Sequence, residues 1–111
     1  LYFFMYYTMI RPWIAYHPGE YLVDALSVKG WTQKEFADIV GISKFEINDI
    51  VKWRRNITPR IAARFGEALG MPASSWLNLQ NMYDLFLIEK NDEEISQREY
   101  IRERVQEMAL A

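Results

Sequence analysis

Two helix-start signals flank a single glycine in the middle of this chain. Thr32 is followed three residues later by Glu35, and Ser43 is followed in the same way by Glu46. Each pair fits a capping box, in which the hydroxyl accepts the N3 amide proton and the glutamate turns back to the cap residue. Gly41 lies between the pairs, and glycine adopts the positive φ of a tight corner at little cost. The spacing therefore predicts two short helices joined by a turn, which is a helix-turn-helix.

The apolar residues of this segment indicate which side of each helix faces inward. They recur at i, i+3 and i+4 spacing, as on one face of an α-helix, and they are Phe36, Ala37, Val40, Ile42, Ile47, Ile50 and Val51. The outward face of the second helix then consists of Lys44, Phe45, Asn48, Asp49 and Lys52. We expect this polar face to be available to a partner.

Helix starts and stops elsewhere predict an all-α chain. Pro18 opens a helix that ends before Gly30, and Thr58 with Pro59 opens another that ends at Gly70. A longer helix is expected from about residue 73 to 88, and a last one from about residue 93. No strand pattern or internal repeat stands out. The predicted organisation is an N-terminal arm over 1–16, a helix-turn-helix domain over 17–88 and an acidic helical extension over 89–111.

The composition of the 111 residues excludes several classes of protein. The chain has no cysteine and a single histidine, so disulfides, thiolate catalysis and cysteine zinc sites are excluded. We expect no enzyme, metal site or cofactor, no membrane span, and a cytoplasmic location. Leu1-Tyr2-Phe3 is typical of the remainder of a cleaved tag, and the apolar start lacks the basic region of a signal peptide.

Charge is segregated along the chain. Residues 29–69 hold eight Lys and Arg against five acids, a balance of +3, whereas residues 82–111 hold four bases against eight acids, a balance of −4. A phosphate backbone responds to the local field of the face that docks on it, and a remote tail is screened beyond about 8 Å. The overall charge of −2 therefore permits DNA binding.

The predicted helix over 73–88 is apolar on most of its circumference, with only a narrow polar stripe. Such a helix has to be buried on two sides. A homodimer would supply the second burial, through Trp76, Leu79, Tyr83, Phe86 and Leu87. The alternative is that the N-terminal arm or the C-terminal helix folds back over it.

Residues 17–87 resemble the HigA-type (VapI-type) antitoxins, a branch of the lambda-repressor-like (XRE) helix-turn-helix proteins. Three segments carry the resemblance: Arg11-Pro12 with His17-Pro18-Gly19-Glu20, the motif over 32–50, and Trp76-Leu77-Asn78-Leu79-Gln80 with Tyr83-Asp84-Leu85. The resemblance implies a five-helix domain with an additional C-terminal helix. It also implies a dimer that binds its own double-stranded operator DNA and neutralises a HigB/RelE-like toxin, an mRNA endonuclease.

The resemblance also places the expected DNA contacts. Gln33 matches a position that reaches a backbone phosphate, and Ser43, Lys44, Phe45 and Asp49 match positions that face the major groove. Lys44 could bond guanine, while Phe45 could make only apolar contact, for example with a thymine methyl. Asn48 shares their outward face, and Lys52, Arg54 and Arg55 would hold phosphates.

Two departures from the family pattern bear on DNA binding. Relatives usually have Asn-Gly where this chain has Lys52-Trp53. Because a bulky tryptophan adopts a positive φ only at a cost, we expect the second helix to run on through Trp53. Glu46 and Asp49 place carboxylates near the reading face, where Asp49 could accept from cytosine or repel phosphate.

Other residues allow more than one interpretation. His17 is expected to belong to the lead-in of the first helix rather than to act as a base. Trp53 is open to base stacking, and the acidic run over 92–94 is either a solvated connection or a docking site for a basic toxin. A stand-alone repressor, or a dimeric adaptor with weak DNA binding, remains the alternative to an antitoxin.

Overall fold

The computed structural model describes residues 15–110, and these form six helices. They are α2 (Pro18–Lys29), α3 (Gln33–Val40), α4 (Lys44–Val51), α5 (Pro59–Leu69), α6 (Ala73–Glu89) and α7 (Asp92–Leu110). The expectations for the N-terminal arm, including the tag-like start and Arg11-Pro12, lie outside the described residues except at positions 15 and 16. Within the described part, the all-α prediction is confirmed, and each predicted helix is present.

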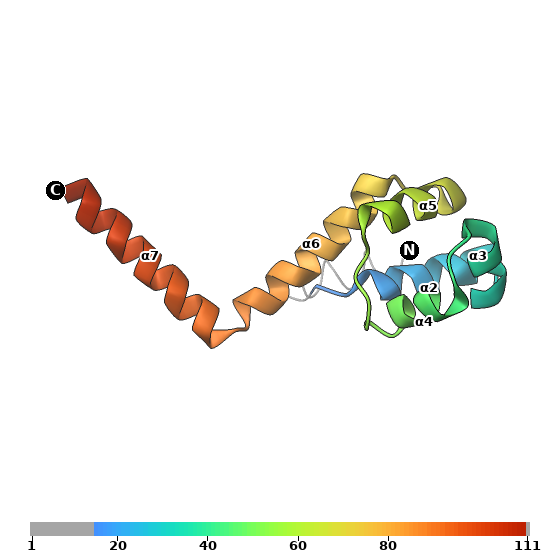
Figure 1. Ribbon diagram of the computed structural model, residues 1–111, viewed down its shortest axis with the longest axis horizontal. Helices are drawn as coiled ribbons and strands as arrows, with labels where there is room; N and C mark the ends of the chain where they lie inside the picture. The colour runs from blue at the N-terminus through green and yellow to red at the C-terminus, as the bar shows by residue number, and fades with distance from the viewer. Residues whose placement is uncertain (1–14, 111) are drawn as a thin grey trace.

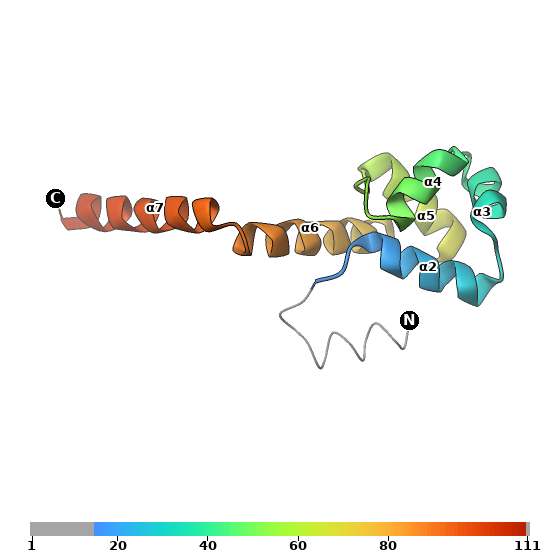
Figure 2. The ribbon, with the colours of Figure 1, turned by 90° about the horizontal axis from the view of Figure 1, so that it is seen from below.

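The helices α2 to α5 and the first half of α6 enclose one core (Figures 1 and 2). Phe65 of α5 lies at its centre, with ring centroids 5.1 Å from Phe36 and 5.3 Å from Trp76, both edge-on. Aliphatic side chains from α2 to α5 and their connecting turns complete the core: Leu22, Leu26, Val40, Ile42, Ile47, Ile50, Ile57 and Ile61. The predicted inward faces of α3 and α4 are thus the buried ones.

The ends of the helices lie where the capping residues predict. Thr58 Oγ1 accepts the N–H of Ile61 over 3.4 Å at the start of α5, directly before Pro59 at its first position. Gly30, Gly41 and Gly70 follow α2, α3 and α5 with positive φ angles of 71°, 66° and 82°. These stops orient each helix for the next turn of the chain.

The last helix, α7, leaves the body of the molecule. It continues away from the far end of α6, and the chain reaches an extent of 60 Å in this direction against 30 and 22 Å in the others (Figure 1). Arg98 Nη1 and Glu89 Oε1 form an ion pair of 2.6 Å across the α6–α7 corner. The alternative that the C-terminal helix folds back over α6 is therefore wrong. No helix among residues 15–110 is long and apolar enough to cross a membrane.

Candidate nucleic-acid interface

The two helices of the motif begin at hydroxyl caps, as the sequence predicts. Thr32 Oγ1 accepts the N–H of Glu35 and Ser43 Oγ accepts the N–H of Glu46, each over 3.1 Å. The Thr32 hydroxyl also donates to the Glu35 carboxylate. The Glu46 carboxylate lies 3.6 Å from Arg60 Nη2 of α5. This carboxylate therefore faces a cation of its own chain.

A hydrogen bond between Gln33 of α3 and Asn48 of α4 links the two helices of the interface. Asn48 Nδ2 donates to Gln33 Oε1 over 3.1 Å, and both residues are partly buried. The bond uses only part of the capacity of the two amides, which together hold four N–H groups and two carbonyl oxygens. The pair therefore fixes the two helices against each other and keeps donors and acceptors for a ligand.

The first turn of α4 is the most open part of the predicted face. Ser43, Lys44 and Phe45 are exposed, and Phe45 is 85% accessible. Lys52 is exposed at the other end of the helix. Among residues 15–110, neither lysine forms an ion pair. Both ammonium groups are thus free to meet phosphate or base edges.

The Asp49 carboxylate, which could have repelled DNA, has a partner. It lies 3.6 Å from Arg55 Nη2, and both side chains are partly exposed. A pair of this kind adds little to stability. It does neutralise the carboxylate locally, and it directs Arg55 back toward α4. The structure therefore brings Asp49 and Arg55 together, but it ties one of the two predicted phosphate-holding arginines to an acid.

The expectation that α4 runs on through Trp53 is wrong. The helix ends at Val51, and Trp53 has a φ of 64°. The N–H of Trp53 donates to the carbonyl of Ile50 over 3.1 Å, and the N–H of Arg54 donates to the carbonyl of Asp49 over 2.7 Å. These two bonds make a Schellman motif, with the tryptophan in the position that glycine usually fills.

Aromatic packing explains why a tryptophan occupies this position. Its ring is stacked on His17 at 5.9 Å between centroids, and Tyr16 and Tyr83 meet it edge-on at 6.5 and 5.7 Å. A Cβ on Gly19 would come within 2.1 Å of the Ile50 carbonyl oxygen, so only glycine allows α2 this close to α4. Trp53 is 39% exposed, and its ring belongs to this cluster.

His17 has a structural role at the start of α2. Its Nδ1 accepts the N–H of Gly19 over 2.9 Å, so the imidazole caps the helix, and the residue is 1% exposed. Burial lowers the pKa of His17 below 6.5, although the backbone of Arg55 and the carboxylate of Asp84 act in the opposite direction. The neutral ring therefore carries its proton on Nε2. This confirms the lead-in interpretation and adds the cap.

Gln80 belongs to a segment that carries the family resemblance, but its role beside this site was not predicted from the sequence. It is 4% exposed and binds the segment between α4 and α5: its Oε1 accepts the N–H of Ile57 over 2.7 Å, and its Nε2 donates to Asn56 Oδ1 over 3.2 Å. The spacing of Trp76, Gln80 and Tyr83 places Gln80 on the inner side of α6. That spacing was the signal that could have found it.

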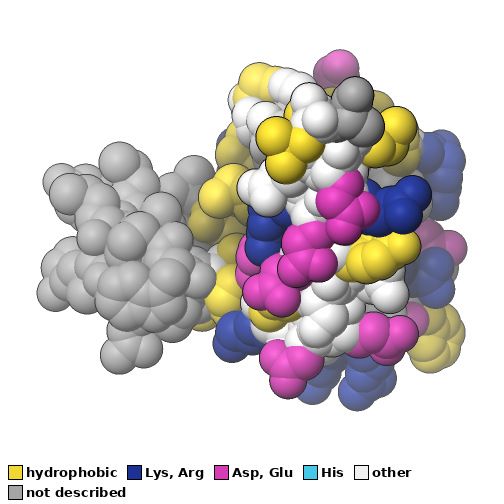
Figure 3. Space-filling view, turned by 90° about the vertical axis from the view of Figure 1, so that its left-hand side faces the viewer, with side chains coloured by type: hydrophobic (Ala, Val, Ile, Leu, Met, Phe, Trp, Pro, Cys, Tyr) yellow, Lys and Arg dark blue, Asp and Glu magenta, His cyan; other side chains and the backbone are white. Residues whose placement is uncertain are grey.

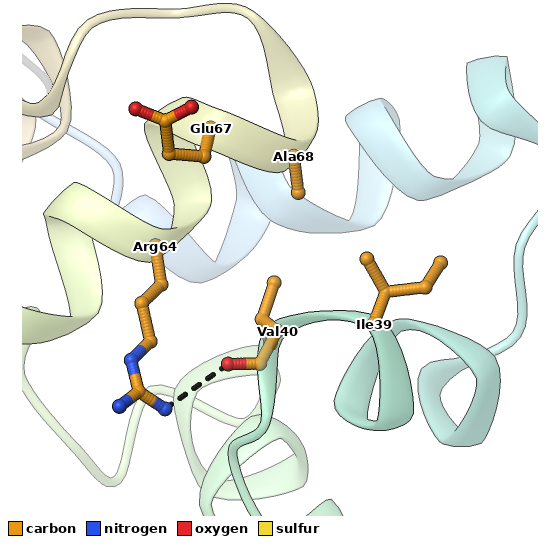
Figure 4. A pocket seen from close by; sticks show the side chains of 5 residues that line it. All are labelled: Ile39, Val40, Arg64, Glu67 and Ala68. Atoms are coloured by element: carbon orange, nitrogen blue, oxygen red, sulfur yellow. Dashed lines mark hydrogen bonds between the residues drawn. The ribbon is translucent and has the colours of Figure 1, made fainter.

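A shallow hollow of about 290 Å³ lies between α3 and α5 (Figure 4). Ile39, Val40 and Ala68 give it an apolar floor, with Arg64 and Glu67 at its edge. Arg64 Nη1 donates to the carbonyls of Val40 and Gly41 over 3.1 and 2.8 Å, and so caps the end of α3. This arginine is used within the fold and is not part of the predicted DNA face.

The predicted dimer surface of α6 is only partly available. Trp76 is 1% exposed and packs on Phe65, so it belongs to the core of the single chain, and its assignment to the dimer interface is corrected. Leu79, Tyr83 and Phe86 are partly exposed and Leu87 is 47% exposed. These four remain candidates for contact with a second copy.

The end of the molecule formed by α7 has a different surface. Side chains of Asp and Glu form a band on it, with hydrophobic side chains on both sides (Figure 3). Glu99, Glu103 and Glu107 lie on one side of the helix at i, i+4 and i+8. Ile101 and Val105 lie on the opposite side and are 57% and 61% exposed.

Known proteins share both the sequence and the arrangement of these helices. Residues 29–76 match the helix-turn-helix family model. The virulence-associated protein I of Dichelobacter nodosus is 37% identical over 83 residues, which cover 74% of this chain and 77% of that protein.

Two solved structures extend the likeness to the fold. An addiction module antidote protein of the HigA family from Coxiella burnetii is 28% identical, with a TM-score of 0.67 over 74% of this chain and 91% of that one. The antitoxin HigA of Pseudomonas aeruginosa, solved with the higBA promoter, is 31% identical, with a TM-score of 0.69 over 76% and 94%. The chain belongs to the HigA-type (VapI-type) family of helix-turn-helix proteins.

Proposed function

We propose that this chain is the antitoxin of a toxin–antitoxin pair and represses its own operon by binding operator DNA through α3 and α4. The observation that carries the proposal is the outward face of α4, where Lys44 and Phe45 stand free beside the Gln33–Asn48 pair. Free N–H groups and the helix dipole at the starts of α3 and α4 favour phosphate. The HigA relative solved with promoter DNA supports the same use of the fold.

The proposed contacts divide into two kinds. Lys44, Phe45, Asn48 and Asp49 would meet base edges in the major groove, which is wide enough for a helix. Gln33, Lys52, Arg54 and Arg55 would hold phosphates, which position the protein and carry little sequence information. Ser43, at the start of α4, would face the major groove beside Lys44. Asp49 is expected to contribute least, since Arg55 already occupies its carboxylate.

The test is binding to the promoter region of the chain's own operon at several salt concentrations. Arg54→Ala with Arg55→Ala should lower the slope of log affinity against log salt by about 0.9 for each phosphate that the variant no longer neutralises. Lys44→Ala should mainly reduce the preference for the operator over unrelated DNA. Arg102→Ala with Arg104→Ala removes the same charge from α7 and serves as the matched control. Equal slopes for the two double variants would contradict the proposed interface.

We further propose a homodimer formed through apolar side chains of α6 that the fold of the single chain leaves partly exposed. Leu79, Tyr83, Phe86 and Leu87 offer partly exposed apolar surface on one helix, and symmetric dimers suit operators with two half-sites. Phe86→Glu should give monomers in sedimentation and weaken DNA binding, whereas Asn81→Glu on an exposed part of α6 should do neither. A wild-type protein that sediments as a monomer at tens of micromolar would exclude this dimer.

The proposed protein partner is a HigB/RelE-like toxin. Such an enzyme has to bind ribosomes and mRNA, so we expect it to be basic and complementary to the acidic side of α7. Charge would steer the encounter, while exposed apolar side chains such as Ile101 and Val105 would hold the complex.

Capture of the product of the neighbouring gene tests the partner. Truncation after Ile88 should weaken capture more than promoter binding. Equal capture by the full-length and truncated chains would move the toxin site to the body of the protein. Capture by neither form would favour a stand-alone repressor.

A further inference from the structure

The two arginines proposed to hold phosphate lie on a segment without regular structure. Arg54 and Arg55 follow the end of α4, and α5 begins only at Pro59. Long side chains on a loose loop lose conformational freedom when they bind, which reduces the affinity that they contribute. A functional group on a loop therefore has to be held by its surroundings. Both ends of this segment are held.

The end of the segment nearer α5 is bound by Gln80 of α6. Its carbonyl oxygen accepts the N–H of Ile57 over 2.7 Å, and its amide nitrogen donates to Asn56 Oδ1 over 3.2 Å and to Asp84 Oδ1 over 2.9 Å. A glutamine amide has two N–H groups and one oxygen, so every polar group of this side chain is used. With 4% of its surface exposed, Gln80 binds in a site that water hardly reaches.

The end nearer α4 is fixed by Trp53. The left-handed backbone of this residue turns the chain out of the helix, and its ring lies against His17 and Tyr83. The N–H of Arg54 is bonded to the carbonyl of Asp49 over 2.7 Å. The arginine pair thus lies between an aromatic support and a hydrogen-bonded one, and α6 contributes to both through Tyr83 and Gln80.

We infer that Gln80 is a positioning residue for DNA binding: from the inner side of α6 it holds the segment 54–57 so that Arg54 and Arg55 meet the phosphate backbone. This rests on the proposed function of the α3–α4 face. Gln80 itself is buried, so it is not expected to contact DNA directly. Its effect therefore passes through the arginines and should appear in the electrostatic part of the affinity.

The experiment measures promoter binding between 50 and 200 mM salt for the full-length chain and its Gln80→Met variant. Methionine has a similar length and forms none of the three bonds. Raising the salt from 50 to 200 mM lowers the affinity by about 3.5-fold for each phosphate that the protein neutralises. Each phosphate contact that Gln80→Met loses should therefore reduce the overall decrease in affinity by about 3.5-fold. Asn56→Ala removes one of the three bonds without burying a charge, so it serves if Gln80→Met does not fold.

Two controls separate positioning from a general decrease in stability. Phe65→Leu removes the ring contacts with Phe36 and Trp76 and none of the three hydrogen bonds of Gln80, so it should lower stability and leave the salt dependence unchanged. In the Arg54→Ala, Arg55→Ala background, Gln80→Met should have no further effect on the salt dependence.

A wild-type salt dependence in Gln80→Met, or an equal reduction in the arginine-free background, would overturn the inference. Wild-type protein that binds no promoter DNA at 50 mM salt would overturn the proposed function, and the inference with it.

Discussion

The corners that follow α3 and α4 have nearly the same positive φ and different residues. Gly41 has a φ of 66° and Trp53 a φ of 64°. Glycine adopts this conformation freely, whereas a side chain costs about 1–2 kcal/mol. At the second corner, rings from distant parts of the chain surround the tryptophan. The comparison shows that one turn of the motif is encoded locally and that the other is imposed by tertiary packing.

Of the substitutions at the two corners, removal of the Trp53 ring should cause the largest decrease in the free energy of unfolding. Trp53→Ala keeps the left-handed strain and removes the packing on His17, Tyr16 and Tyr83. For a ring that is partly exposed, we expect the free energy of unfolding to fall by about 2 kcal/mol, less than for a fully buried aromatic residue. Urea denaturation measures the change. Phe45→Ala, at an exposed aromatic residue, should change it by less than about 0.5 kcal/mol.

Substitutions that change only the cost of the positive φ should alter the free energy of unfolding by a smaller amount. Gly41→Ala should cost about 1 kcal/mol from the positive φ, since the nearest atom to a new Cβ, 3.3 Å away, is the end of the Arg64 side chain. Trp53→Gly should be about 1 kcal/mol more stable than Trp53→Ala, because both lack the ring and only glycine avoids the strain. Equal stability of the two variants at position 53 would show that the strain is absent.

The smallest expected effect is a pH dependence confined to the second corner. The pKa of His17 is lowered in the folded chain, so the unfolded chain takes up the proton first as the pH falls. Stability is then full well above pH 6.5 and decreases as the pH falls through this value, by at most about 0.7 kcal/mol between pH 7 and pH 6.

His17→Asn keeps an acceptor for the Gly19 N–H and removes the titrating ring. Ordinary carboxylates titrate near about pH 4, outside this range. Urea denaturation at pH 7 and pH 6 should therefore show a decrease in stability in the wild type and none in this variant. The same decrease in both proteins would contradict the assignment to His17.

Local sequence signals predicted most of the fold. Thr32, Ser43 and Thr58 each cap the helix that they were expected to start, and the inward faces of α3 and α4 are buried as their spacing indicates. A cap depends on residues three positions apart, and a helix face on residues three or four apart. Both are therefore legible in a short stretch of sequence.

The parts that were missed depend on residues far apart in the chain. Gln80 and Ile57 are 23 residues apart, and their hydrogen bond exists only because α6 packs beside the segment that follows α4. The rule that a bulky residue avoids positive φ is sound locally, and at Trp53 the stack on His17 overrides it. The predicted DNA contacts themselves are placed on an accessible face, and their roles stay predictions.

The separation of α7 from the body alters how large this protein should look in solution. Its radius of gyration is 17.8 Å, whereas a compact chain of 111 residues would have about 13 Å. A rod-like projection slows diffusion more than the same mass would if it were part of a compact body. A single copy should therefore elute from a sizing column ahead of compact standards of equal mass, and only a method that weighs the particle can count its subunits.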